Sequence, residues 1–183
     1  MKVDLSRYDN SWYNPGRPSL IRILWYFINL FVFMSPLFPF YSLKRLLLRW
    51  FGASVGEGVI VKPRVNIKYP WHVKIGANSW IGEGVWIDSL GAVEIGANCC
   101  LSQEVLLLCG NHNFMRETFD LMVGEIVLED GVWIGARSVV TGNTFCGSHS
   151  VLAVQSVSPS RMESFGVYRG NPAEKIKERK PVD

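Results

Sequence analysis

The chain has 183 residues, of which 48% are hydrophobic and 19% charged, so a disordered chain is excluded and one domain with a buried core is expected. The net charge of +3 is too small to indicate a nucleic-acid-binding protein. The charge is unevenly distributed, because residues 1–50 hold seven Lys or Arg against two Asp, whereas the remainder holds 12 against 14 acidic residues. The N-terminal end is therefore the basic part of the chain.

Residues 1–52 are predicted to form a helical segment ahead of the main domain. Two apolar runs, Ile23–Met34 and Leu43–Phe51, are separated by prolines. A membrane-spanning helix needs about 20 clean apolar residues, and this stretch contains Arg22 and Asn29. We therefore expect a broken pair of helices and no transmembrane span.

This segment has two compatible roles, and the sequence leaves both open. It can cover the open end of a repeat fold, where unpaired strand edges otherwise promote aggregation. Residues 1–50 can also rest on a membrane surface, because their aromatic and basic side chains suit the interface. The first residues are polar and show no signal peptide, so we expect a cytoplasmic protein with peripheral contact at the inner membrane face.

A six-residue repeat governs the chain from Val55 onward. Its aliphatic column comprises Val55, Val61, Ile67, Val73, Ile75, Ile81, Ile87, Val93, Ile95, Leu101, Leu107, Leu128, Ile134, Val140, Cys146 and Leu152. Neither an amphipathic helix nor an alternating strand has this period. Three six-residue units form one flat triangular coil, and stacking such coils about 4.8 Å apart turns the column into a continuous core. The spacing predicts an all-β parallel β-helix over 53–160, in preference to a β-sandwich of short strands.

Two further positions of the six-residue repeat also favour particular residue types. Glycine follows the aliphatic residue at positions 56, 76, 82, 96 and 135. Four places after the aliphatic residue stand Val59, Val65, Ser79, Val85, Cys99, Val105, Val132, Ser138, Thr144, Ser150 and Ser156. These small or Val side chains are expected to fit beside the core where the chain turns.

Two segments depart from the period of six. Residues 108–125 interrupt it as a loop, and a loop that leaves a rigid scaffold is a common place for function. Residues 161–183 follow it as a C-terminal extension, in which the basic stretch Lys175–Lys180 is predicted to be a short helix.

The repeats, the loop that begins Gly110-Asn-His112 and the closing Arg169–Ala173 together resemble the hexapeptide acyltransferases. A narrower resemblance, to the colanic-acid-type (WcaF) exopolysaccharide acetyltransferases, is carried by Leu47–Ala53, Val65–Trp71, Ser89–Gly91 and Trp133–Ala136. The resemblance implies a left-handed β-helix that uses acetyl-CoA and no metal. It also implies a homotrimer with the coenzyme between subunits, and a sugar or lipid-linked saccharide as acceptor.

His112 matches the catalytic histidine of that family, although a lone histidine is often only structural. A sugar hydroxyl is a poor nucleophile near neutral pH, and an imidazole can take its proton as it attacks the thioester. Cys109 lies three residues away, so a Cys–His nucleophile pair is conceivable. The family's direct transfer instead implies a structural Cys109.

Three residues are candidates for binding the acceptor. Asp88 precedes Leu108 by one coil of 20 residues, so the two are expected to stack at the root of the loop. Its carboxylate can help His112 or the acceptor, or it can be a solvated corner residue. Asn111 and Asn113 flank His112 and are further polar candidates.

The coenzyme site also follows from the resemblance. The family's pantetheine contacts match Gly135 and Ala136 and, one coil of 18 residues later, Ala153 and Val154. Small side chains there leave backbone groups free to bond the pantetheine amides. Lys177 matches the position that holds the nucleotide phosphates.

The competing functions are a γ-class carbonic-anhydrase-like protein and a non-catalytic β-helix. The first needs three histidines around zinc, and His72, His112 and His149 fall on different coils. The four cysteines form no C-x-x-C pair and indicate neither a zinc site nor a disulfide framework. A purely structural β-helix has no need for the loop at 108–125.

Overall fold

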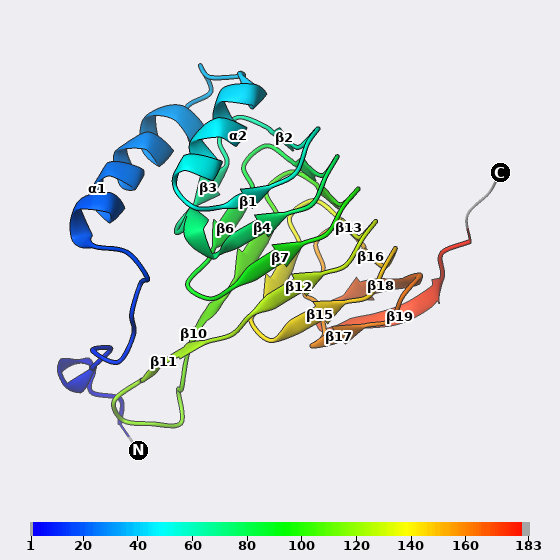
Figure 1. The fold of residues 1–183 in the computed structure, drawn as a ribbon. Coiled ribbons are helices and arrows are strands. Elements are labelled where there is room, and N and C mark those ends of the chain that lie inside the picture. The colour runs from blue at the N-terminus through cyan, green and yellow to red at the C-terminus, as the bar shows by residue number, and fades with distance from the viewer. Residues whose placement is uncertain (1, 181–183) are drawn as a thin grey trace.

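Three sheets form the sides of a triangular solenoid in the computed structural model, which describes residues 2–180 (Figure 1). Sheet A contains β1 (Ser54–Val55), β4 (Val73–Ile75), β7 (Val93–Ile95), β12 (Ile126–Leu128), β15 (Thr144–Cys146) and β17 (Arg161–Met162). Sheet B contains β2 (Ile60–Val61), β5 (Trp80–Ile81), β8 (Cys100–Leu101), β13 (Trp133–Ile134), β16 (Val151–Leu152), β18 (Gly166–Gly170) and β19 (Ala173–Glu178). Sheet C contains β3 (Asn66–Ile67), β6 (Trp86–Asp88), β9 (Leu106–Leu108) and β14 (Val139–Thr141). The chain passes from A to B to C in each of the first four coils, so the predicted parallel β-helix is confirmed.

The hydrophobic core is formed by the aliphatic residues that the six-residue period predicted. Every residue of the aliphatic series from Val55 to Leu152 is buried, and so is every residue of the small-or-Val column. The register repeats the expected coil lengths, since Ile75 pairs with Ile95 and Ile134 pairs with Leu152. The six-residue period therefore places the same side of each strand inward in every coil.

The glycine column has a steric cause. A Cβ added at Gly56 would lie 2.5 Å from the backbone nitrogen of Ala77, and one at Gly135 would lie 2.6 Å from that of Val154. At both positions the next coil's backbone occupies the space of a side chain. The corners between sheets A and B require residues that tolerate a positive φ. Asn78 (φ 60°) and Asn98 (φ 56°) lie there in the left-handed conformation, which asparagine tolerates.

Helices α1 (Ser19–Ile28) and α2 (Tyr41–Trp50), joined through the π-helical turn η2 (Asn29–Phe33), cover the first coil (Figure 1). Trp25, Phe33 and Leu48 are buried, and the Trp25 indole donates to the carbonyl oxygen of Ile67 at 2.8 Å. The predicted broken helix pair therefore caps the open end of the solenoid. Within residues 2–180, no helix combines the length and the apolar character that crossing a membrane requires.

The loop at 108–125 is a hairpin rather than an irregular excursion. Strand β10 (Gly110–His112) pairs antiparallel with β11 (Leu121–Val123), and the hairpin leaves the solenoid at the corner between sheets C and A. The N-terminal arm, with the short 3-10 helix η1 (Leu5–Arg7), lies beside it (Figure 1). Backbone and side-chain contacts join the two, because Asp4 N donates to Glu117 O at 2.9 Å and Arg7 forms an ion pair with Glu117.

The prediction of a short C-terminal helix is wrong. Residues Ala173–Glu178 form strand β19, which pairs antiparallel with β18 at the edge of sheet B. Lys175 to Lys180 have acceptable helix propensity, but the unpaired edge of β18 offers a row of backbone hydrogen bonds, and such tertiary pairing overrides propensity. The final residues of the predicted extension, 181–183, lie outside the described part of the chain.

Candidate active site

His112 is held in one orientation by Phe119, which lies across the hairpin. Its Nδ1 is 3.0 Å from the carbonyl oxygen of Phe119, and the two rings stack with centroids 4.5 Å apart. A carbonyl can only accept, so Nδ1 carries the proton and Nε2 presents its lone pair. In the described residues Nε2 bonds to no protein donor, so its lone pair is left without a protein partner.

The N-terminal arm completes the surroundings of His112. The Tyr8 ring lies against the imidazole with centroids 5.7 Å apart. Tyr13 anchors the arm, because its hydroxyl donates to the carbonyl oxygen of Leu90 at 2.8 Å. The sequence assigned residues 1–50 to the cap or a membrane, and no periodic signal indicated that Tyr8 lies beside the histidine.

Asn111 and Asn113 shape the hairpin. The Asn111 side-chain oxygen accepts from the backbone N–H of His112 at 2.8 Å, and that of Asn113 accepts from Met115 at 3.1 Å. Both oxygens are thus occupied within the loop, whereas neither side-chain amide nitrogen donates to an acceptor in the described part of the chain. A role in acceptor binding for either residue stays a prediction.

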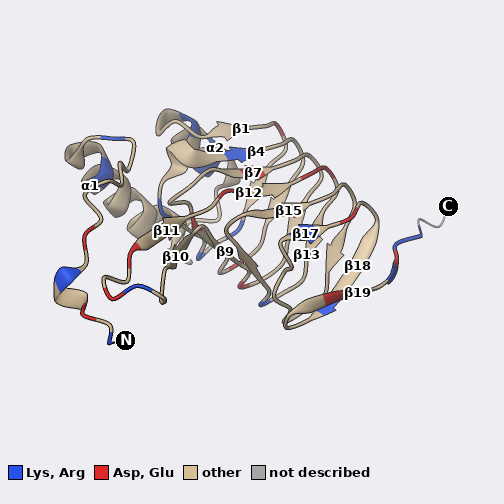
Figure 2. Ribbon diagram, turned by 90° about the horizontal axis from the view of Figure 1, so that it is seen from below, with Lys and Arg blue, Asp and Glu red and all other residues tan. Residues whose placement is uncertain are grey.

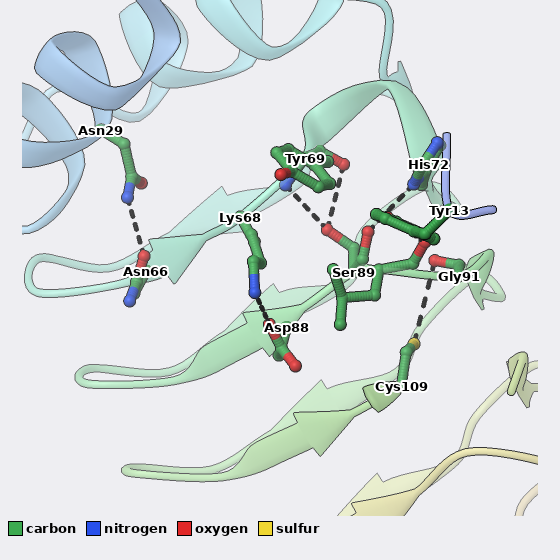
Figure 3. A network of polar contacts seen from close by, with 11 residues as sticks. Tyr13, Asn29, Asn66, Lys68, Tyr69, His72, Asp88, Ser89, Gly91 and Cys109 are labelled. Atoms are coloured by element: carbon green, nitrogen blue, oxygen red, sulfur yellow. Dashed lines mark hydrogen bonds and ion pairs between the residues drawn. The ribbon is translucent and has the colours of Figure 1, made fainter. Parts of the chain in front are cut away.

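Asp88 lies beneath the root of the hairpin, as its predicted stacking with Leu108 requires. The carboxylate is only 5% exposed, and its Oδ1 forms an ion pair with Lys68 Nζ at 3.1 Å (Figure 3). A Cβ added at Gly110 would lie 3.4 Å from its Oδ2. Asp88 is therefore not a solvated corner residue, and its charged partner is Lys68 rather than His112.

Cys109 is buried at the same corner. Its Sγ points to the carbonyl oxygen of Gly91 at 3.8 Å (Figure 3). Burial raises the pKa of the Cys109 thiol to about 11. A nucleophilic cysteine needs a lowered pKa, so these surroundings suit a structural thiol.

The five predicted coenzyme residues lie around one cavity of about 930 Å³, at the corner between sheets B and C. They are Gly135, Ala136, Ala153, Val154 and Lys177. In the described chain the backbone N–H groups of Ala136 and Val154 donate to no protein acceptor, so the cavity offers free donors to an amide-bearing ligand. No residue of the hairpin lines this cavity.

The rim of the cavity is positively charged. Arg169, Lys177, Arg179 and Lys180 line it, against the single carboxylate of Glu178. The Trp133 ring forms part of the wall and is fixed by a 2.9 Å hydrogen bond from its indole to Ser102 Oγ. The free N–H donors and the cationic rim fit a pantetheine chain and the phosphates of a nucleotide.

The three histidines lie apart. His72 Nδ1 contacts the carbonyl oxygen of Ser89 at 3.0 Å, and His149 stacks on Phe165 at 5.0 Å. Across residues 2–180, no group of three or more His, Cys, Asp or Glu side chains is placed to hold a metal ion.

The sequence missed Phe119 and Lys68 among the residues that contact the predicted site. A signal existed for Lys68, because it precedes Asp88 by one 20-residue coil and stacks with it like every other residue of that coil. No such signal existed for Phe119, which lies in the hairpin where the period of six fails.

Comparison with family models returned no match. The chain is 31% identical over 156 residues to a protein of Escherichia coli strain K12 named as the colanic acid biosynthesis acetyltransferase WcaF, covering 85% of this chain and 86% of the relative.

Solved structures share the fold at lower identity. A hexapeptide-repeat acetyltransferase of Vibrio cholerae, in complex with acetyl-CoA, superposes with a TM-score of 0.79 and 21% identity over 88% of each chain. A galactoside acetyltransferase in complex with CoA gives 0.77 and 23%, covering 88% of this chain and 82% of the other. Both likenesses agree with the predicted left-handed hexapeptide-repeat β-helix.

Proposed function

Because this chain belongs to the WcaF group of hexapeptide-repeat acetyltransferases, we propose that it transfers the acetyl group of acetyl-CoA to a hydroxyl of a sugar or exopolysaccharide precursor. The observation that carries the proposal is the bond from His112 Nδ1 to the Phe119 carbonyl, which leaves Nε2 to act as the base. The named biosynthetic role of the E. coli relative supports a saccharide acceptor.

In the proposed reaction, Nε2 of His112 removes the proton of the sugar hydroxyl while the oxygen attacks the thioester carbonyl. The tetrahedral intermediate collapses to the acetyl ester and the coenzyme thiolate, which takes the proton back from the imidazolium. The Phe119 carbonyl stabilises that imidazolium by accepting from Nδ1. No covalent acyl-enzyme is needed.

The cavity at the corner between sheets B and C is proposed to hold acetyl-CoA. The N–H groups of Ala136 and Val154 would bond the pantetheine amides, and Lys177 with its basic neighbours would hold the phosphates. The two related structures above contain acetyl-CoA or CoA, which supports the same donor here.

We propose that the enzyme works as a homotrimer. His112 is carried at the corner between sheets C and A, whereas the coenzyme cavity lies at the corner between sheets B and C and contains no hairpin residue. A second copy would bring its hairpin to this cavity, so the complete site would lie between subunits.

The helical cap is proposed to bring the enzyme to the inner face of the cytoplasmic membrane. No acidic residue stands between Asp9 and Glu57, and α1 and α2 carry only basic charges (Figure 2). The cap also exposes large apolar side chains, including Leu20 at 75%, Phe31 at 62% and Leu37 at 80%. Basic charge beside an apolar helix face suits an anionic bilayer surface.

The test is a thiol-release assay with acetyl-CoA and a panel of free sugars, nucleotide sugars and lipid-linked saccharides. Acceptor-dependent release of CoA, with an O-acetyl ester in the product, is expected from the wild-type protein. Release that needs no acceptor, or an acetyl amide as product, would contradict the proposal.

A further inference from the structure

The N-terminal arm, residues 2–15, is attached to the solenoid at one end and to the hairpin at the other (Figure 1). At the solenoid, the Trp71 indole donates to the carbonyl oxygen of the last residue of the arm at 2.7 Å. At the hairpin, Arg7 forms an ion pair with Glu117 at 2.9 Å. Tyr8 directly follows that ion pair, so both attachments together fix its place beside the hairpin.

Tyr8 differs from the other large side chains of the outer part of the arm. Val3, Leu5 and Trp12 are exposed, and no residue of η1 is buried. The arm therefore adds little apolar surface to the core of the protein. Tyr8 is half-buried, and its ring lies against the imidazole of His112. Hydrophobic burial does not explain why the arm follows the hairpin, whereas a role for Tyr8 beside His112 does.

Two aromatic rings flank the imidazole of His112 in different ways. The Phe119 ring is nearly parallel to it, at 7°, and covers one of its faces. The Tyr8 ring is tilted by 55°, with centroids 5.7 Å apart. Among residues 2–180 the Tyr8 hydroxyl forms no hydrogen bond. The imidazole thus has one neighbour that fixes its plane and one neighbour with an unused polar group.

A tyrosine with an unused hydroxyl is suited to contact a sugar. A sugar ring has faces made of C–H groups, which pack on aromatic rings, and an edge of hydroxyls, which need hydrogen-bond partners. The Tyr8 hydroxyl can both donate and accept. A sugar whose reacting hydroxyl lies at Nε2 of His112 has its remaining atoms within a few ångströms of that nitrogen. The Tyr8 ring, 5.7 Å from the imidazole, lies within the same range.

We infer that Tyr8 contacts the acceptor and determines which sugar is accepted, an inference that rests on the acetyltransferase function proposed above. The Tyr8 ring packs on one face of the sugar whose reacting hydroxyl lies at His112. The Tyr8 hydroxyl bonds to a second hydroxyl of that sugar. A sugar that lacks this second hydroxyl, or carries it on the other face, leaves the bond unmade and is disfavoured. The N-terminal arm thereby forms one side of the acceptor site.

The first experiment measures thiol release by the full chain with the methyl glycosides of galactose, glucose and mannose. The KM for the preferred glycoside should rise about 10- to 100-fold in Tyr8→Ala and about 3- to 10-fold in Tyr8→Phe, which loses the hydroxyl alone. Tyr8→Ala should also accept the three glycosides more evenly. Leu5→Ala, at an exposed position of the same arm, is the matched control and should keep the wild-type KM.

The division between KM and kcat separates acceptor contact from a structural role. No residue of the arm lines the coenzyme cavity, so the KM for acetyl-CoA should change less than about twofold in Tyr8→Ala. The kcat at saturating glycoside should stay within about threefold, because the contact of His112 with Phe119 is kept. An unchanged glycoside KM in Tyr8→Ala, or an equal fall of kcat with all three glycosides, overturns the inference.

A second experiment needs no turnover and therefore separates failure of this inference from failure of the proposed function. Diethyl pyrocarbonate modifies free imidazole nitrogens, and mass spectrometry of the peptides reports each histidine. At least one of the three glycosides should slow modification of His112 in the wild type, but not in Tyr8→Ala, while His149 reacts equally in all samples. Protection of His112 without acetyl transfer would overturn the proposed function and support the sugar contact. No protection in the wild type, or equal protection in Tyr8→Ala, overturns the inference.

Discussion

The imidazole of His112 and the backbone carbonyl of Phe119, 3.0 Å apart across the hairpin, fix which nitrogen carries the proton. The stacked Phe119 ring, 7° from parallel, holds the imidazole in that plane. The proposed proton acceptance at Nε2 therefore depends on a contact made inside the loop rather than on the solenoid.

Replacing His112 with Ala should lower kcat about 10²- to 10⁴-fold, because the general base is lost. The affinity for CoA should stay near that of the wild type, since no hairpin residue lines the coenzyme cavity. Steady-state kinetics and calorimetry with CoA measure the two effects. His149→Ala, which removes a ring stacked on Phe165 at another corner, is the matched control and should retain turnover. Near-normal turnover in His112→Ala would contradict the proposed role of His112 as the general base.

Cys109→Ser should retain activity within about fivefold, because a thiol whose pKa is raised to about 11 by burial is protonated at neutral pH. The native Cys109 thiol should also react slowly with a thiol reagent such as DTNB and rapidly after unfolding. Initial rates and thiol titration provide the measurements. Complete loss of activity in a folded Cys109→Ser protein would instead favour a covalent acyl-enzyme.

The solenoid could be predicted from the sequence because each coil places an aliphatic side chain inward at the same position of the strand. Ile75 and Ile95, which pair in adjacent coils, are an example. The 20-residue length of the first coils likewise predicts the pairing of Asp88 with Leu108. The contact of Tyr8 with His112 could not be predicted in this way, because it joins an arm without a period to a loop without a period. The C-terminal strand was missed because its pairing partner, the edge of β18, exists only after the coils have stacked.

Lys44 makes the stability of the cap depend on pH. Its ammonium is buried and donates to the carbonyl oxygen of Lys62 at 2.9 Å, and burial lowers its pKa from 10.5 to about 8. Between these pH values the unfolded chain binds a proton that the folded chain has released. The free energy of unfolding should therefore rise with pH across this window, by at most about 1.4 kcal/mol per pH unit.

Urea titrations of wild-type and Lys44→Met protein from pH 7 to 10.5 measure this effect. The variant should lack the rise, whereas Lys180→Met, at an exposed tail position, should retain it. Identical slopes for the wild type and Lys44→Met would contradict the assigned shift.

Mixed trimers should recover activity from two inactive variants. His112→Ala lacks the base, and Val154→Trp fills the coenzyme cavity at a residue that is 60% exposed, so the solenoid should tolerate it. If each site takes its hairpin and its cavity from different subunits, random mixing restores roughly a quarter of the sites. Co-refolding followed by the thiol-release assay measures the recovery. No recovery in mixed trimers, or a monomer in light scattering at micromolar concentration, would contradict a shared site.

The helical cap should bind anionic liposomes at low salt and be released at high salt. Each basic residue near such a surface contributes about 1 kcal/mol, which supports reversible attachment without insertion. The double variant Phe31→Asp/Leu37→Asp places two charges on side chains that are 62% and 80% exposed and leaves the core of the cap unchanged. It should lose flotation with the liposomes, whereas Met115→Asp, at a 70% exposed position of the hairpin, should float like the wild type. Absence of flotation for the wild-type protein at low salt would mean that the segment serves only to cover the first coil.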